Sequence, residues 1–258
     1  MTKGDPMNTL LRGMVRAVAE TFDLPAPILE VGSYQVERQE DIADLRPLFP
    51  GRPYVGLDMR PGPGVDLVGD VEALPQADAS VGTVLALETF EHVRHFWRGF
   101  DEIRRVLRPD GALLIASPFH FHIHDYPRDY WRFTPDALKL LLEAYPSKIL
   151  GWNGPTTRPA NVWCVAFREE RPPITPAQFH RYQTLLKQYA RMPLPWTRRL
   201  RYHIGRLFFG RRPFAPWLDR ETCHGELVVA RGAGVVARGA WRVAREDKLP
   251  RRSVVQKG

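Results

Sequence analysis

The sequence predicts an α/β fold in which helices cover both faces of one mostly parallel sheet. Short apolar segments alternate along the chain with longer segments whose apolar residues recur every three or four positions. The short segments are apolar almost throughout, which is typical of parallel strands buried on both faces. The 258 residues are enough for one full core and a small appendage.

The N-terminal elements are predicted by apolar periodicity and by the residues that interrupt it. Apolar side chains recur at helical spacing from Leu11 to Val18, and Pro25 and Pro27 end that helix. The apolar runs that follow stop at a glycine or an acid, as buried strands do where they enter a turn. The elements expected here are a helix over residues 8–22, strands over 28–32, 54–58 and 65–68, and a helix over 35–48 that Pro47 closes.

The same alternation continues toward residue 170. Pro109 stops one helix, and Thr134 begins another as an N-cap, with Pro135 in the first turn. The elements expected here are a strand over residues 81–87, a helix over 95–107, a strand over 111–116, a helix over 134–144, and strands over 149–152 and 162–167. The sheet is therefore expected to have seven strands.

The charge distribution divides the chain near residue 170. Residues 1–170 contain 18 Lys and Arg against 24 Asp and Glu, whereas residues 171–258 contain 19 against 5. Such an asymmetry marks compositionally different segments. We expect an N-terminal helix in residues 1–24, an α/β domain over 25–170, a basic extension over 171–245 with a strand at 226–230, and a disordered polar tail over 246–258.

Targeting features and cysteines predict a cytoplasmic protein. No stretch approaches the roughly 18 consecutive apolar residues that a spanning helix needs. Residues 1–11 lack the apolar core and the cleavage site of a secretory signal. Cys164 and Cys223 have no motif spacing, and a reducing compartment is the simplest explanation.

Three residues at predicted strand ends have the chemistry of a nucleoside site. In open α/β sheets, ligands bind outside the carboxyl ends of the strands. Gly32 follows the first strand, where the absence of a Cβ lets a ligand approach the backbone. Asp58 ends the second strand and can accept hydrogen bonds from both ribose hydroxyls, and Asp70 follows the third strand, near the adenine amino group. The three together predict an adenosine site.

Five successive motifs resemble those of the class I methyltransferases of the UbiE/type 11 group. They are Glu-Val-Gly-Ser at residues 30–33, Val-Gly-Leu-Asp at 55–58, Gly-Asp-Val-Glu-Ala-Leu-Pro at 69–75, Leu-Glu-Thr-Phe-Glu-His-Val at 87–93 and Arg-Val-Leu-Arg-Pro-Asp-Gly at 105–111. The resemblance covers about residues 25–170. It implies a Rossmann-like sheet, a methyltransferase domain and S-adenosyl-L-methionine as the methyl donor.

The resemblance also implies roles for individual residues. Glu30 and Gly32 would line the methionine end, Asp58 would hold the ribose, Asp70 and Val71 would meet the adenine, and Leu87 and Glu88 would lie beside the sulfonium. The sequence departs from the family at two positions. Gly32 is the one glycine of its turn, where the family usually has two or three, and Gly82 replaces an acid that often opens the fourth strand. The single-glycine turn puts in doubt how the methionine moiety is held.

The segment over residues 117–134 resembles an acceptor lid found in bacterial members of the group. His92, Tyr130 and Trp131 are the candidate acceptor-pocket residues, although His92 as a packed helix-start residue and the two aromatic residues as core remain alternatives. If the acceptor is a hydroxyl, a base is needed, and His124 or Asp125 is the candidate. His120, His122 and His124 alternate, but zinc spacing motifs are absent, so no metal site is expected.

The basic extension leaves several partners open. A helix near residues 197–209 would gather apolar residues on one face and arginines on the others. Residues 196–217 would then pack on the catalytic domain, rest on an anionic membrane surface as a peripheral contact, touch a nucleic acid or bind a protein. Packing on the oppositely charged domain is the preferred interpretation, and nucleic acid is disfavoured.

The function expected from these features is S-adenosylmethionine-dependent methylation of a small or medium-sized acceptor. A sugar or cell-envelope metabolite hydroxyl is preferred, by analogy alone. One alternative is a nicotinamide-dependent oxidoreductase, against which the missing Gly-x-Gly-x-x-Gly turn argues. The other is a non-catalytic, degenerate methyltransferase fold that docks on a membrane or polymer.

Overall fold

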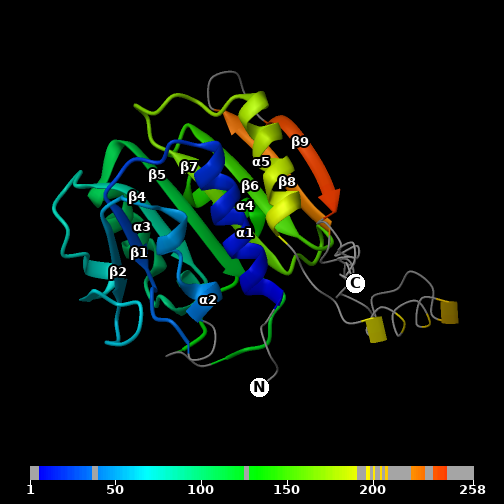
Figure 1. Cartoon of the computed structure of the whole chain (residues 1–258), viewed down its shortest axis with the longest axis horizontal. Helices are drawn as coiled ribbons and strands as arrows, with labels where there is room; N and C mark the ends of the chain where they lie inside the picture. The colour runs from blue at the N-terminus through cyan, green and yellow to red at the C-terminus, as the bar shows by residue number, and fades with distance from the viewer. Residues whose placement is uncertain are drawn as a thin grey trace, which may run out of the picture.

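Helices lie on both sides of one continuous sheet, and the segments alternate along the chain as the apolar pattern predicts (Figure 1). The computed structural model describes residues 6–36, 40–124, 128–190, 196–197, 200, 204, 207–208, 222–229 and 235–242. The predicted α/β, Rossmann-like fold class is confirmed.

The sheet has nine strands in the described part of the chain, where seven were expected. They are β1 (Ile28–Val31), β2 (Tyr54–Asp58), β3 (Leu67–Val68), β4 (Val81–Leu87), β5 (Leu107–Pro118), β6 (Ser147–Asn153), β7 (Asn161–Phe167), β8 (Thr222–Val229) and β9 (Val235–Arg242). Their order is β3-β2-β1-β4-β5-β7-β6-β8-β9. The first five strands in this order, from β3 through β2, β1 and β4 to β5, pair in parallel. The remaining pairs, β5–β7, β7–β6, β6–β8 and β8–β9, are antiparallel. The strand order reverses between β1 and β4, which is where such sheets bind ligands.

Two groups of helices bury the two faces of the sheet. The longer helices are α1 (Pro6–Thr21), α3 (Phe96–Val106), α4 (Pro135–Leu141) and α5 (Pro176–Tyr189), with a short α2 (Glu40–Ala43) and 3₁₀ turns η1 (Arg46–Leu48), η2 (Val71–Ala73) and η3 (Phe90–His92). Helices α1 and α5 share one apolar cluster, and α3 and α4 share the other. Gly13 lets α1 approach α5 closely, since a Cβ there would lie 2.6 Å from the backbone nitrogen of Ala190.

The helix starts follow the capping chemistry of the sequence. Thr134 caps α4 by accepting a hydrogen bond from the Ala137 N–H at 3.0 Å, as predicted. Thr175 and Gln178 form a capping box at the start of α5, a helix that the sequence analysis did not predict. Strand β9 was also missed. Both elements come from the segment predicted as a basic extension, yet they pack on the same sheet.

The helix predicted over residues 35–48 is confirmed only in part. Among the residues that the structure describes there, 40–43 form α2 and 46–48 form η1, whereas 35–36 and 44–45 are not helical. Gln35 instead donates its N–H to the Pro63 carbonyl at 2.9 Å, so the chain follows the loop after β2. Contact with that loop outweighs the local helical pattern.

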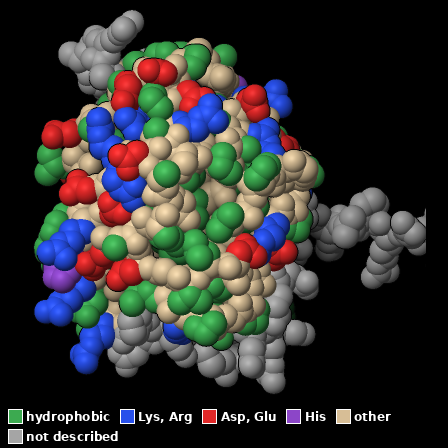
Figure 2. Space-filling model, turned by 90° about the vertical axis from the view of Figure 1, so that its left-hand side faces the viewer, with side chains coloured by type: hydrophobic (Ala, Val, Ile, Leu, Met, Phe, Trp, Pro, Cys, Tyr) green, Lys and Arg blue, Asp and Glu red, His purple; other side chains and the backbone are tan. Residues whose placement is uncertain are grey.

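Charges of both signs are interspersed on the face shown in Figure 2. Elsewhere as well as on this face, charges of opposite sign can neutralise one another: among the described residues, Arg105 pairs with Asp78 at 2.7 Å and Arg46 with Asp66 at 2.7 Å. This face therefore offers no surface of a single sign. Among the helices that the structure describes, none is long and apolar enough to cross a membrane.

Candidate active site

The carboxyl ends of β1 to β4 meet at one edge of the sheet. The Gly32 N–H donates to the Leu57 carbonyl at 2.8 Å, and the Gly69 N–H donates to the Asp58 carbonyl at 2.9 Å. The Thr89 hydroxyl, just after β4, donates to the Val31 carbonyl at 3.1 Å. The structure thus brings together the strand ends from which the sequence predicted an adenosine site.

Gly32 is required by a contact within the protein. Its φ is +78°, in the left-handed region, and a Cβ would lie 2.2 Å from the Thr89 hydroxyl oxygen. The space on the Cβ side of Gly32 is therefore taken by Thr89. The N–H groups of residues 32–35 all donate within the protein, to Leu57, to Asp58 and to Pro63. The turn consequently leaves no backbone donor of these four residues for a methionine carboxylate.

Asp58 is held at the tip of β2 by the neighbouring backbone. Its Oδ1 accepts from the Arg60 N–H at 3.0 Å, and its Oδ2 accepts from the Tyr34 N–H at 3.3 Å. The Arg60 guanidinium lies over the Tyr34 ring, 4.4 Å from its centroid. A carboxylate has about four acceptor positions, so Asp58 retains capacity for two further donors. Its side chain is 11% exposed, which leaves a narrow approach.

The two residues predicted to contact the adenine, Asp70 and Val71, follow β3, the strand that neighbours β2 in the sheet. Asp70 is exposed and caps η2, accepting from the Glu72 N–H at 2.9 Å. Val71 is buried in the cluster under α3. The Asp70 carboxylate is thus a structural cap that still faces solvent, and Val71 is a core residue at the edge of the strand tips.

The end of β4 carries a strained residue. Leu87 is the last residue of β4, and Glu88 follows it with a φ of +52°, a conformation that costs a non-glycine residue about 1–3 kcal/mol. The Glu88 N–H donates to the Ala116 carbonyl at 2.9 Å, which holds the bend against β5. Strain of this kind concentrates at functional sites, where the surrounding structure fixes it.

Glu30 lies on β1, one residue before its end. It is buried, and its Oε2 accepts from the Tyr54 hydroxyl at 2.7 Å. Burial raises the pKa of the Glu30 carboxyl to about 7, although the Tyr54 hydrogen bond and the nearby Arg46 oppose the change. The Glu30 carboxyl therefore changes its protonation state near neutral pH. A cation or a hydrogen-bond donor close to it would favour the charged form.

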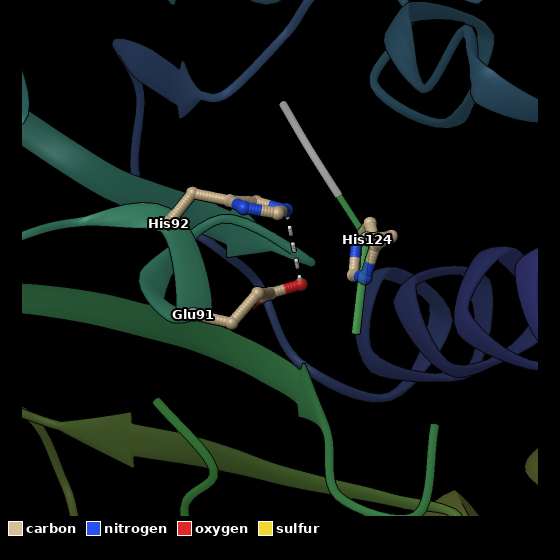
Figure 3. A group of neighbouring side chains, drawn as sticks. All are labelled: Glu91, His92 and His124. Atoms are coloured by element: carbon tan, nitrogen blue, oxygen red, sulfur yellow. Dashed lines mark ion pairs between the residues drawn. The ribbon is translucent and has the colours of Figure 1, made fainter. Parts of the chain in front are cut away.

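On the acceptor side, η3 and the loop after β5 bring three side chains to one point. Glu91, His92 and His124 lie together and point toward one another (Figure 3). Glu91 is fully buried and accepts from the Ser117 hydroxyl at 3.1 Å. Burial raises the pKa of Glu91 to about 8 and lowers the pKa of His92.

Asp129 orients His124. The His124 ring Nδ1 lies 3.0 Å from Asp129 Oδ2, and the His124 N–H donates to the same oxygen at 3.1 Å. Arg132 pairs with both oxygens of Asp129 and holds the pKa of that carboxyl down at about 2. Asp125, the other candidate base, lies outside the described residues. Asp129 is therefore the carboxylate beside the candidate base His124 in the described part of the chain.

Tyr130 and Trp131, the other residues predicted to line the acceptor pocket, anchor the loop after β5 to η3 and the residue that follows it. The Tyr130 N–H donates to the Glu91 carbonyl at 2.7 Å, and the Trp131 indole donates to the Val93 carbonyl at 3.0 Å. Trp131 packs against the core, whereas the Tyr130 side chain is exposed. The sequence analysis assigned no role to Glu91 or Asp129, although the Glu-His pair after a strand end was a usable signal for the first.

Two cavities of the protein lie away from these strand ends. One of about 390 Å³ is lined by residues that include Arg104, Arg105 and Arg168. The other, of about 380 Å³, is lined by residues that include Pro146, Glu170 and Val229. Neither is lined by a residue predicted to bind the cofactor or the acceptor. The candidate cofactor site therefore lies at the strand tips, outside both cavities.

Known proteins are similar to parts of this chain. Over 76 residues it is 43% identical to phthiotriol/phenolphthiotriol dimycocerosates methyltransferase 1 of Mycobacterium ulcerans, covering 25% of this chain and 28% of the relative. Over 82 residues it is 35% identical to malonyl-(acyl-carrier protein) O-methyltransferase of Methylococcus capsulatus, covering 27% and 30%. The similarity thus spans less than a third of the length of either curated relative.

Among solved structures, a Burkholderia thailandensis 1,6-didemethyltoxoflavin-N1-methyltransferase is 18% identical with a TM-score of 0.49, covering 63% of this chain and 80% of that one. Residues 53–115 match the family model described as methyltransferase domain. The matched segment runs from the start of β2 into β5 and contains Asp58, Asp70 and Glu91. Over this segment, which is about a quarter of the chain, the protein is similar to methyltransferase domains.

Proposed function

We propose that the protein transfers a methyl group from S-adenosylmethionine to an oxygen of a small or medium-sized acceptor. The observation that carries this proposal is the Asp58 carboxylate, fixed at the tip of β2 by two backbone N–H groups with acceptor capacity remaining. The match of residues 53–115 to the methyltransferase-domain family model supports S-adenosylmethionine as the cofactor. The name of the Methylococcus capsulatus relative, an O-methyltransferase, supports an oxygen acceptor.

Each strand tip has a distinct part in holding the cofactor. Asp58 accepts hydrogen bonds from the ribose hydroxyls, and Asp70 and Val71 border the adenine. Gly32 and Glu30 lie toward the methionine end, and Leu87 and Glu88 lie beside the sulfonium. Since no N–H of residues 32–35 remains for the methionine carboxylate, other donors must hold it. The buried Glu30 carboxyl would favour the methionine ammonium electrostatically.

The acceptor lies between η3 and the loop after β5. There His92, Tyr130 and Trp131 would contact it. S-adenosylmethionine would supply an electrophilic methyl group on its sulfonium. The acceptor oxygen would take this methyl group, S-adenosylhomocysteine would leave, and the proton of the hydroxyl would pass to a base or to solvent. The protein contributes chiefly by holding nucleophile, methyl carbon and sulfur in line. A sugar or other cell-envelope hydroxyl remains the preferred acceptor.

Calorimetric titration of S-adenosylmethionine into the full chain tests the proposal. Asp58→Ala should weaken binding by about 1–3 kcal/mol, because the ribose loses charge-assisted hydrogen bonds. Asp101→Ala, which removes an exposed acid of α3, is the matched control and should bind as the parent does. Absence of binding at millimolar ligand would exclude the proposal. Equal affinity in the Asp58 and Asp101 variants would exclude the ribose assignment.

The basic segment remains a separate proposal. Of residues 196–217 the structure describes 196–197, 200, 204 and 207–208. The apolar side chains among them are exposed, with Leu207 at 83% and Phe208 at 78%. Their exposure supports peripheral contact with an anionic membrane more than packing on the domain. The rest of residues 196–217 lies outside the described residues. Cytoplasmic localisation stays a prediction.

A further inference from the structure

Glu91, His92 and His124 form a cluster of side chains that adenosine binding does not require. Each offers one atom able to bind a metal, and these three atoms all lie within 4.8 Å of one another (Figure 3). Glu91 and His92 come from η3, and His124 comes from the loop after β5. Of the alternating histidines His120, His122 and His124, the cluster contains His124 alone.

The hydrogen bonds of the two imidazoles fix which nitrogen is available. The His92 Nδ1 lies 2.7 Å from the Arg128 carbonyl oxygen, which can only accept, so Nδ1 is the donor. The His124 Nδ1 likewise faces the Asp129 carboxylate at 3.0 Å. In the neutral form each ring therefore keeps its lone pair on Nε2. An imidazole oriented by an oxygen acceptor on its other nitrogen is the usual arrangement of a metal ligand.

Glu91 supplies an independent observation. Its side chain is fully buried, and Oε2 accepts from Ser117, but Oε1 has no hydrogen-bond partner among the described residues. Oε1 instead faces His92 Nε2 at 3.9 Å, too far for a hydrogen bond. A buried carboxylate oxygen without a partner is costly. A cation between the two atoms would satisfy both.

We propose that Glu91, His92 and His124 bind a divalent transition-metal ion such as Zn²⁺. Two imidazoles and one carboxylate suit such ions and leave coordination positions open. Ligand atoms about 2.1 Å from a tetrahedral ion stand roughly 3.4 Å apart, so atoms that now lie up to 4.8 Å apart would have to approach one another. The His124 Nδ1 would keep its contact with Asp129 while its Nε2 approaches the ion.

Metal binding changes the role expected for His124. A lone pair that binds a metal cannot accept a proton, so His124 would not be the general base. An ion in the open site would instead bind the acceptor oxygen and lower its pKa, so that the proton leaves to solvent. This last step rests on the proposed function, whereas the metal site itself does not.

Metal titration of the chelator-stripped, tag-free full chain tests the site without activity. We expect one equivalent of Zn²⁺ to bind by calorimetry, and Co²⁺ to give an absorption spectrum of nitrogen and oxygen ligands. Glu91→Gln, His92→Asn and His124→Asn should each lower the affinity by about 100-fold or more. Asp129→Asn, which loosens the orientation of His124, should lower it by about 10–100-fold. His122→Asn, on the same loop but outside the cluster, is the matched control and should bind as the parent does.

Several results would overturn the inference. They are the absence of stoichiometric binding, equal affinity in parent and Glu91→Gln, or an equal loss in His122→Asn. Circular dichroism of each variant shows whether it is folded. If Glu91→Gln does not fold, His92→Asn and the Co²⁺ spectrum decide. A thiolate signature would also contradict the site, since Cys164 and Cys223 are buried elsewhere. S-adenosylmethionine binding to the stripped protein is measured in parallel, so failure of the metal site and failure of the proposed function are distinguishable.

Discussion

Glu30 should make the stability of the protein depend on pH in a defined direction. Its carboxyl is buried on β1, and its pKa rises from the ordinary 4.5 to about 7. Between these values the folded state binds a proton that the unfolded state releases. The stabilisation from this proton is complete below the unfolded pKa and is lost as the pH rises through the folded pKa.

The size of the effect follows from the shift. One pKa unit corresponds to about 1.4 kcal/mol, so Glu30 should lower the free energy of unfolding by about 3 kcal/mol between pH 4 and pH 8. Glu30→Gln keeps the shape and an acceptor for the Tyr54 hydroxyl but removes the ionisation. The difference in stability between the variant and the parent should therefore increase by about 3 kcal/mol in favour of the variant over this range.

Urea unfolding at a series of pH values measures this difference. Other buried acids, Glu91 among them, titrate in both proteins and cancel in the comparison. Glu143→Gln removes an exposed acid of the same kind. Its free energy of unfolding should change with pH as that of the parent does. If the free energy of unfolding of Glu30→Gln also changes with pH as that of the parent does, the pKa of Glu30 is not raised by burial and the prediction is wrong.

Three substitutions test the packing by urea unfolding. Gly32→Ala should destabilise by about 2–4 kcal/mol, because the new Cβ adopts a left-handed φ and meets Thr89; a Thr89→Ala background should recover part of the loss, and full additivity would contradict the contact. Gly13→Ala should destabilise by about 1–3 kcal/mol through overlap with the α5 backbone, and a stabilised variant would show that the helices move apart. Tyr182→Phe should cost about 1–3 kcal/mol, since it removes the acceptor 2.9 Å from the buried Trp163 indole nitrogen, and an unchanged free energy of unfolding would show that this bond is replaced.

The parallel half of the sheet was predictable because its signals are local. Each of its strands is a short apolar run stopped by a glycine or an acid, and parallel strands necessarily present their carboxyl ends at one edge. The order Gly32, Asp58, Asp70 therefore specified a common edge without any knowledge of tertiary contacts. The predicted strands over 149–152 and 162–167 were found as well, at β6 and β7.

Elements that depend on distant contacts were missed or misassigned. Residues 35–48 have a helical pattern, but the loop after β2 binds Gln35 and interrupts it. Strand β9 pairs with β8, and its mixed composition shows no alternation strong enough to identify it. The contact that requires glycine at position 32 was missed for a similar reason, because the Thr89 side chain that excludes a Cβ is 57 positions away in the sequence.

The acceptor side shows why a catalytic loop is harder to predict than a strand tip. The position of His124 is set by Asp129, which Arg132 holds, while the backbone of the same loop donates through Tyr130 to the Glu91 carbonyl. The Arg128 carbonyl in turn orients His92. The loop and η3 therefore fix each other, so the geometry of the cluster exists only when both are folded together. A spacing rule applied to the histidines of one segment cannot find such a cluster, because Glu91 and His92 come from a turn that precedes the loop by a whole helix and strand.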